Sequence, residues 1–460
     1  MDDVLAYLDG SRDAQLADLK QLLEIPSIST LPERSGDVAR CAEALAGRLR
    51  AIGMTTVEVA RTAGHPIVYA EWAGAPGAPT ALVYGHYDVQ PVDPLELWDS
   101  PPFEPTERDG RLYARGAADD KGQVHMHLAA LAAHLSTRGR LPVNVKLLIE
   151  GEEEISSLHL EEFIRTNRDR LRADVGVISD TAMYAPGVPS IVYALRGIAY
   201  VQLEVEGART DLHSGEYGGA VANPAQVLCE IVAAMKDPRT GRVLVDGFYD
   251  RVRDLDPAER AELAKLPFDE AAYRDELGVP VLFGEEGYST TERTGARPTL
   301  EINGIWAGFT GEGAKTVLPA KASAKISCRL VPDQDPEEVA DLIERFVARV
   351  APPTVRARLV RLHGGRPAMT PIDHPAVRAA SRALERAFGQ PPLFTREGGS
   401  IPVVASLDVL LGLKTVLFGA ALPNCGMHAP NEWLDLDSYF RGTKAVALFL
   451  NELGSAPDLR

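Results

Sequence analysis

Over its first third, the chain alternates amphipathic stretches with short apolar runs. The stretches 13–23 and 38–52 repeat apolar residues at helical spacing, and Pro26 ends the first of them. The runs 56–60 and 67–72 are short and contain β-branched and aromatic residues, which favours strands. We therefore predict alternating helices and strands, an order that is typical of an α/β sheet.

Four further apolar runs each lead to a His, Asp or Glu side chain. We predict that these runs are buried strands. Ligands of open α/β sheets bind outside the carboxyl ends of the strands, so we expect the four polar groups to converge there. The runs are 80–84 with His86 and Asp88, 141–149 with Glu150 to Glu154, 174–179 with Asp180, and 414–418 with His428 after a glycine-rich turn.

The pair His86 and Asp88 suits a metal ligand and the carboxylate that orients it. If the strand ends at Tyr84, both side chains lie just past its end and on one side of the extended chain. His86 would bind an ion through one ring nitrogen and donate its other N–H to Asp88. A His-x-Asp sequence alone is more often a surface or loop pair, so the prediction depends on the other strand ends.

Two adjacent acids, Asp119 and Asp120, lie in a glycine-flanked turn before an amphipathic helix. Asp is a common helix N-cap, which explains one acid better than two. The helix itself carries three histidines that we expect to be packing or surface residues: His125, His127 and His134.

The converging groups outnumber the three protein ligands of a catalytic zinc ion. Three consecutive acids repel one another, and the ordinary interpretation is a solvated charge run. Two metal ions bridged by one carboxylate would instead use five ligands and lower the pKa of a shared water from about 15.7 toward about 7. One acid of the triplet would remain as a general base. The ligands in this count are His86, Asp119, one of Glu152 to Glu154, Asp180 and His428.

Composition excludes several classes of protein. The 460 residues, 45% of them hydrophobic, are enough for a large core and two or three domains. A net charge of −17 argues against nucleic-acid binding. The acidic start of the chain and the lack of long apolar runs predict neither a signal peptide nor a membrane span. Four widely spaced cysteines predict free thiols in a reducing, cytoplasmic compartment: Cys41, Cys229, Cys328 and Cys425.

The pattern changes between residues 196 and 369, where we place a second domain. Its predicted elements follow the order β-α-β-β-α-β, which is typical of a ferredoxin-like domain, and the polar segment 236–298 interrupts them. The predicted strands are 199–205, 299–304, 322–330 and 355–362, and the helices are 224–235 and 336–350.

Six motifs occur in the order Gly85-His-Tyr-Asp-Val-Gln-Pro91, Arg115-Gly-Ala-Ala-Asp-Asp-Lys-Gly122, Glu150-Gly-Glu-Glu-Glu154, Asp211-Leu-His-Ser-Gly215, Arg396-Glu-Gly-Gly-Ser-Ile-Pro402 and Gly426-Met-His428. Over nearly the whole chain they resemble the di-zinc peptidases that include aminoacylase, carboxypeptidase G and carnosinase, with the cytosolic non-specific dipeptidase branch the most similar. The resemblance implies an α/β fold with a mixed sheet flanked by helices. Residues 1–195 and 370–460 would form the catalytic domain, and residues 196–369 an inserted ferredoxin-like α+β lid and dimerisation domain.

The resemblance also implies the chemistry of the site. It implies two Zn²⁺ per subunit, with Mn²⁺ or Co²⁺ as alternatives, and a cis peptide between Asp119 and Asp120. One ion would be held by His86, Asp119 and Asp180, the other by Asp119, Glu154 and His428, with Glu153 as general base and Asp88 behind His86.

Further roles fall in the inserted domain and in the fifth motif. In a homodimer, the counterpart of His213 reaches the active site of the partner and steadies the oxyanion. Without the resemblance, Arg329 is equally well a structural ion pair and His213 a loop histidine. The resemblance implies that Arg329 and His363 hold the substrate carboxylate and that Thr316, Gly399 and Ser400 line the pocket.

These roles imply metal-dependent hydrolysis of the peptide bond of dipeptides or short peptides. An N-acyl amino acid deacylase or a carboxypeptidase needs the same metals and is the alternative within the enzyme class. A non-catalytic binding protein is disfavoured because every ligand and the base are present. The chain departs from the family at Ser156, where glycine is usual, and this leaves the shape of that turn open.

Overall fold

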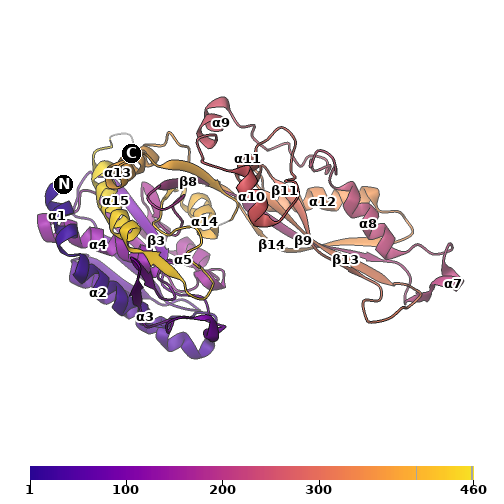
Figure 1. Cartoon of the computed structure of the whole chain (residues 1–460), viewed down its shortest axis with the longest axis horizontal. Helices are drawn as coiled ribbons and strands as arrows, with labels where there is room; N and C mark the ends of the chain where they lie inside the picture. The colour runs from indigo at the N-terminus through magenta and orange to yellow at the C-terminus, as the bar shows by residue number, and fades with distance from the viewer. Residues whose placement is uncertain (400, 457–458, 460) are drawn as a thin grey trace. The chain divides into compact units, whose positions relative to one another are not determined.

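The structure is a computed structural model that describes residues 1–399, 401–456 and 459, and its elements are labelled in Figure 1. The described chain divides into two compact units. Unit 1 comprises residues 1–193, 370–395 and 406–460, and unit 2 comprises residues 194–369 and 396–405. The segment 396–405, which the sequence grouped with the catalytic domain, thus belongs to unit 2 by its contacts.

Unit 1 is built on a mixed sheet with the strand order β1-β2-β6-β3-β7-β17-β8. Strands β6, β3, β7 and β17 run parallel to one another, β2 is antiparallel to β6 and β1 to β2, and β8 is antiparallel to β17. The mixed α/β fold predicted from the sequence is confirmed. The bounds are β1 (Thr56–Ala60), β2 (Ile67–Trp72), β3 (Thr80–His86), β6 (Asn144–Glu150), β7 (Val175–Ile178), β8 (Ser190–Leu195) and β17 (Thr415–Leu417).

Strand β3 is longer than the predicted run 80–84. Gly85 and His86 remain in register with Ile149 and Glu150 of β6, so His86 is the last residue of the strand and does not lie beyond it. The prediction placed the strand end two residues too early because local hydrophobicity does not reveal this pairing.

Helices flank the sheet of unit 1. They are α1 (Asp2–Gly10), α2 (Arg12–Leu23), α3 (Ser35–Ile52), α4 (Lys121–Arg138), α5 (Leu160–Thr166), α6 (Arg168–Leu171), α13 (Pro375–Phe388) and α15 (Leu436–Gly454), while α14 (Pro402–Leu411) begins in unit 2. Shorter elements are η1 (Pro32–Arg34), η2 (Leu95–Leu97), η3 (Glu153–Ile155), β16 (Leu393–Glu397) and a small sheet of β4 (Thr106–Arg108), β5 (Arg111–Tyr113) and β18 (Trp433–Asp435).

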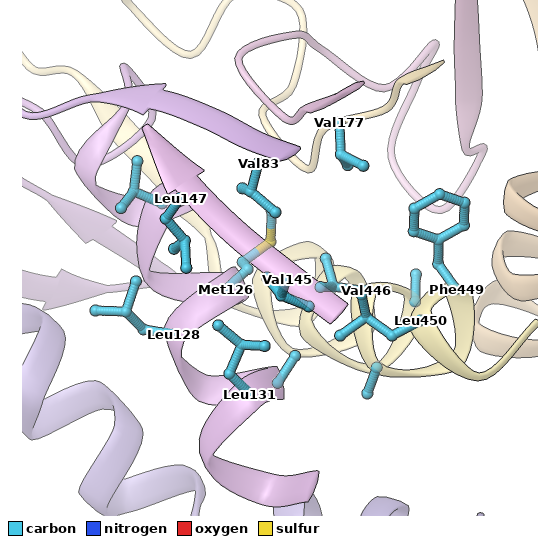
Figure 2. Packing of buried hydrophobic residues seen from close by; sticks show 14 of the residues in the cluster. Val83, Met126, Leu128, Leu131, Val145, Leu147, Val177, Val446, Phe449 and Leu450 are labelled. Carbon is cyan, nitrogen blue, oxygen red and sulfur yellow. The ribbon is translucent and has the colours of Figure 1, made fainter. Parts of the chain in front are cut away.

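The core of unit 1 lies between the parallel strands and helices α4 and α15. Figure 2 shows Val83, Leu147 and Val177 of the strands packed near side chains of the two helices, among them Met126 and Phe449. Alanine and leucine dominate the middle of α4, which suits a helix packed on all sides. The histidines of this helix are packing residues, as predicted: His125 contacts Tyr439, His127 contacts Ser179 and His134 contacts Ala447.

Unit 2 contains an antiparallel sheet with the order β11-β13-β9-β14. Along the chain, helix α8 lies between β9 and β11 and helix α12 between β13 and β14. Together with the strand order, this is the ferredoxin-like arrangement predicted from the sequence. Alternate residues of β9 are buried, as expected for a sheet with helices on one face. The elements are β9 (Gly197–Glu206), α8 (Pro224–Ala234), β11 (Thr299–Ala307), β13 (Lys321–Leu330), α12 (Pro336–Val350) and β14 (Arg356–Gly365).

The polar segment 236–298 contains helices that the sequence pattern does not predict. They are α9 (Pro257–Leu263), α10 (Glu270–Leu277) and α11 (Thr290–Gly295). Unit 2 also holds β10 (Leu212–His213), α7 (Ser214–Tyr217), β12 (Val317–Leu318) and β15 (Ala368–Met369).

Two further predictions concern cysteines and membranes. All four cysteines are free thiols, as predicted, and Cys229 is the exposed one. Within the described ranges, no helix is both long enough and apolar enough to cross a membrane.

His127 should make the stability of unit 1 depend on pH. Burial lowers the pKa of its imidazole from 6.5 to about 4. The unfolded chain therefore binds a proton between these values while the folded chain does not, so the free energy of unfolding should fall as the pH falls through this window. The slope from this one group is at most about 1.4 kcal/mol per pH unit.

His127→Gln keeps a polar group for Ser179 but does not titrate. In urea unfolding of metal-free protein, the advantage of wild type over this variant should shrink as the pH falls from about 6.5 to about 4. Parallel stability curves for the two proteins would contradict the assignment.

Candidate metal centre

Asp119 lies between two histidines that are far apart in the sequence. Its Oδ1 is 3.0 Å from His86 Nε2, and its Oδ2 is 2.9 Å from His428 Nε2. Each carboxylate oxygen thus faces a different imidazole, which is the arrangement that a bridging ligand needs.

Two groups of ligand atoms share this carboxylate. The first group is His86, Asp119 and Asp180, and the second is Asp119, Glu154 and His428, with the ligand atoms of each group within 4.8 Å of one another. Asp180 Oδ2 is 3.7 Å from His86 Nε2, and Glu154 Oε2 is 3.3 Å from His428 Nε2. The structure therefore brings together the five residues that the resemblance implies as metal ligands.

The parallel strands explain why these residues meet. His86 ends β3 and Asp180 lies two residues past β7, so both are at the carboxyl edge of the sheet. Asp119 lies just before α4, and its peptide bond to Asp120 is cis, as the resemblance implied. Glu154 lies in η3 after β6, while His428 comes from the loop after β17.

Asp88 contacts the ligand His86 and the acid triplet. Its backbone carbonyl oxygen is 3.1 Å from His86 Nδ1, while its carboxylate Oδ1 is farther away at 3.4 Å. The carboxylate accepts hydrogen bonds from the backbone N–H groups of Glu153 and Glu154, at 3.2 and 3.1 Å. The closer partner of His86 is therefore the carbonyl of Asp88, and the carboxylate fixes the turn that carries the acids.

The three acids of the triplet have different surroundings. Glu152 is buried and accepts hydrogen bonds from the backbone N–H groups of His65 and His159. Glu154 belongs to the second ligand group, and its Oε2 accepts a hydrogen bond from Gln90. Among the described residues, the carboxylate of Glu153 accepts no hydrogen bond and belongs to neither ligand group, which makes it the spare acid of the triplet.

Crowding of carboxylates controls the protonation of this centre. Burial raises the pKa of Glu154 to about 8, and the negative charge of Asp119 adds to the shift. The hydrogen bond to Asp119 raises the pKa of His428 to about 9. Burial opposes ionisation of Asp119, but hydrogen bonds from His428 and His86 hold its pKa well below the usual range. Without a cation the centre retains protons that metal ions would displace, so the donor set fits metal binding.

Burial also raises the pKa of Glu153, and the charges of His86 and Asp119 act on it in opposite directions. His86 and Asp119 belong to the ligand groups, so their effect on its pKa indicates that Glu153 lies beside these groups. A carboxyl group with a raised pKa, next to a set of metal ligands, is suited to general acid–base work.

The other residues with predicted roles lie in unit 2. His213 ends β10, and its Nδ1 accepts the N–H of Gly215 at 3.0 Å. The carbonyl of Thr316 accepts the N–H of Ser214 at 3.1 Å, so Thr316 lies beside the same short strand pair.

Arg329 and His363 lie on the two strands that flank β9. Arg329 pairs with Ile198, and His363 pairs with Tyr200 and lies against its ring, with centroids 5.1 Å apart. Gly399 follows β16 and is exposed, whereas Ser400 lies outside the described residues.

Two residues without a predicted role contact the ligand groups. Gln90 binds Glu154, and Glu432 binds the turn that carries Asp119. Both lie within four residues of a predicted ligand or its partner, which was the only local signal for them. Their partners are distant in sequence, so their roles depend on the fold.

Ser156 has a left-handed backbone conformation, with φ 75° and ψ 28°. This is the position where the resembling family usually has glycine. The turn therefore forms with serine in the left-handed conformation, which costs a residue with a Cβ about 1–2 kcal/mol. Ser157 also has a positive φ, of 49°.

The chain is similar to known metallopeptidases. The family described as Peptidase family M20/M25/M40 matches residues 82–452. A Cys-Gly metallodipeptidase of Schizosaccharomyces pombe is 32% identical, covering 99% of this chain and 98% of its own length. The human Beta-Ala-His dipeptidase is 31% identical, covering 98% and 92%. A solved structure of an M20 family metallo-carboxypeptidase, Sso-CP2 from Sulfolobus solfataricus, is 34% identical with a TM-score of 0.82, covering 96% and 99%.

Replacing Ser156 by glycine should stabilise the protein. Glycine adopts the left-handed conformation without strain but loses more entropy on folding, so we expect a net gain of about 0.5–1 kcal/mol in the free energy of unfolding. Urea unfolding of metal-free protein measures it. Ser35→Gly is the matched control because Ser35 has φ −55°, and it should give no gain. A loss at Ser156→Gly equal to that of the control would contradict the expectation.

Proposed function

The chain belongs to peptidase family M20/M25/M40, and from this premise we propose that it is a metallodipeptidase that hydrolyses the peptide bond of dipeptides or short peptides. The observation that carries the proposal is the pair of ligand groups that share Asp119. Both curated relatives described above are dipeptidases by name, and each matches almost the full chain.

Two divalent cations per subunit fit the donor set. Nitrogen and oxygen donors from imidazole and carboxylate suit Zn²⁺, and Mn²⁺ or Co²⁺ accept the same donors. His86, Asp119 and Asp180 would hold one ion, and Asp119, Glu154 and His428 the other. When bound, such a pair supplies the Lewis-acid chemistry that makes a water molecule acidic near neutral pH.

Glu153 is the general base of the proposed reaction. It takes a proton from the attacking water, whose oxygen adds to the scissile carbonyl carbon, and later delivers this proton to the leaving amine. Asp88 supports the step because its carboxylate fixes the backbone of Glu153. Arg329 and His363 would bind the substrate carboxylate, and Thr316, Gly399 and Ser400 would line the pocket.

His213 is suited to donate a hydrogen bond to the oxyanion that forms. Since its Nδ1 accepts the N–H of Gly215, a neutral ring carries its proton on Nε2. A donor aimed at the developing negative charge stabilises the transition state.

We place this histidine in the site of the other subunit of a homodimer. The edge strand β11 supports dimer formation because Ile302, Ile305 and Trp306 are exposed on it. Exposed edge strands with large apolar residues are sites of chain association. The free cysteines support a cytoplasmic location.

Carboxypeptidase activity is the second candidate function, supported by the similarity to Sso-CP2. Both reactions use the same ligands and base and differ in how much peptide lies before the scissile bond. A panel of dipeptides, tripeptides and N-acetyl amino acids separates them, and we expect the dipeptides to give the highest kcat/KM.

Glu153→Gln should lower kcat on the best dipeptide by about 10²-fold or more, the usual scale for loss of a general base. KM and the number of bound metal ions should stay unchanged, because Glu153 belongs to neither ligand group. Steady-state kinetics and metal analysis measure these effects.

Glu152→Gln is the control for the register of the triplet. Since Glu152 binds backbone N–H groups of His65 and His159, its loss should lower stability more than kcat. An active Glu153→Gln enzyme beside an inactive, folded Glu152→Gln enzyme would assign the base to Glu152.

Complementation tests whether His213 acts in the partner's site. His213→Ala and Glu153→Gln variants, each inactive alone, are mixed in equal amounts under conditions that exchange subunits. Half of the dimers are then mixed, and each has one site with both residues intact, so about a quarter of wild-type activity should return. No recovery despite proven exchange would place His213 in the site of its own chain, and a fully active monomer would exclude the composite site.

A further inference from the structure

Glu432 belongs to neither ligand group, yet it binds the turn that carries Asp119. Its side chain is fully buried. Oε2 accepts hydrogen bonds from Arg115 Nη1 at 2.8 Å and from the backbone N–H of Gly116 at 2.9 Å. Oε1 accepts the backbone N–H groups of Ala118 at 2.8 Å and Asp119 at 3.0 Å. One carboxylate thus holds four donors of a single turn.

The turn is shaped for close packing. Gly116 has φ 84°, and a Cβ at this position would come within 2.7 Å of Val89 Cγ1. The positive φ is unfavourable for residues with a side chain, and Val89 occupies the space that a side chain would need. Position 116 of this turn therefore requires glycine. The four hydrogen bonds from Glu432 hold the turn in place.

The segment that carries Glu432 also carries a ligand. His428 lies four residues earlier and contacts Asp119 Oδ2 at 2.9 Å. Between them, Asn431 accepts the N–H of Asp99 at 2.8 Å and donates to the carbonyl of Leu97 at 2.9 Å, which anchors the segment. The segment 428–432 therefore contacts Asp119 at two places: Glu432 accepts its backbone N–H, and His428 contacts its carboxylate.

We propose that Glu432 is a positioning residue for both metal ions. By fixing the backbone of Asp119, it sets the place of the only carboxylate that the two described ligand groups share. Loss of a group that orients a ligand typically costs about 10–100-fold in metal affinity. The inference rests on the proposed function only in that the five donors bind cations.

The competing explanation is a structural ion pair between Glu432 and Arg115. Arg115 is itself buried and also donates to the carbonyl of Pro91 at 3.1 Å. A structural pair would affect the stability of metal-free protein and leave the affinity for metal unchanged. Metal binding therefore separates the two roles.

The main variant is Glu432→Gln. The NH₂ group of the glutamine replaces an oxygen that accepts two N–H groups. The backbone N–H groups of Ala118 and Asp119 then lose their acceptor. Zn²⁺ binding to metal-free protein is measured by competition with a chromogenic chelator. We expect two bound equivalents, as in wild type, with both affinities lowered by about 10–100-fold. The visible spectrum of the Co²⁺-loaded variant should also differ from wild type, since it reports the ligand geometry.

Three further variants calibrate this result. His428→Ala removes a ligand from one group only and should abolish one binding step. Arg115→Met leaves the three backbone N–H bonds to Glu432 and should lower affinity less than Glu432→Gln. Glu285→Gln is the matched control: Glu285 is a buried carboxylate paired with Arg297 in unit 2, so it should lower stability without changing either affinity.

Two results overturn the proposal. One is a folded Glu432→Gln protein with wild-type affinity for both equivalents, and the other is the loss of affinity at one step only. If thermal unfolding shows that Glu432→Gln does not fold, Glu432→Asp is used in its place. Aspartate is shorter by one methylene, so its oxygens lie farther from the turn. The same two results then overturn the proposal. A wild-type protein that binds two ions but hydrolyses no peptide would overturn the proposed function and leave this inference standing.

Discussion

Electrostatic repulsion among buried carboxylates is the constraint on which the centre of unit 1 depends. Two kinds of acid relieve this repulsion in different ways. Asp88, Glu152 and Glu432 accept hydrogen bonds from backbone N–H groups and fix turns, so their carboxylate oxygens already have donors. Asp119 and Glu154 instead face histidines across the ligand groups. A buried charge is tolerated only when hydrogen bonds or a counter-ion compensate it. In the second kind of acid this compensation comes from the facing histidines and retained protons, which metal ions would displace.

The parallel strands supply the framework for this division. Neighbouring strands β6, β3 and β7 end at one edge, so residues distant in sequence arrive within a few ångströms of one another. Each ligand comes from a different segment, and its orientation depends on the turn that follows or precedes an element. This explains why the backbone of these turns is bound by buried acids: a ligand on an unsupported loop would not hold the geometry that a metal site requires.

The sequence predicted the elements well where local pattern decides them. Strands β1 and β2 and helix α12 have the bounds expected from apolar periodicity. The end of β3 at His86 was missed because it depends on pairing with β6. The roles within the acid triplet also required the fold, since a partner of Glu152 lies 87 residues away at His65. The role of Glu432 depends on partners more than 300 residues away, which local spacing does not reveal.

Cavity size is a poor guide to the chemistry of this chain. A hollow of about 740 Å³ is lined by residues of α5 and α6 together with Leu411, and it lies before β7, on the amino side of the strand whose carboxyl side leads to Asp180. Three of its arginines, Arg165, Arg168 and Arg172, are exposed, and Arg170 is half-buried. Arg165 and Arg170 already pair with glutamates. Exposed pairs of this kind contribute little energy. Reaction at a metal centre instead requires donors fixed within tenths of an ångström. The convergence of five ligands, of which all but His428 are at least half-buried, is therefore a better guide to the site than empty volume.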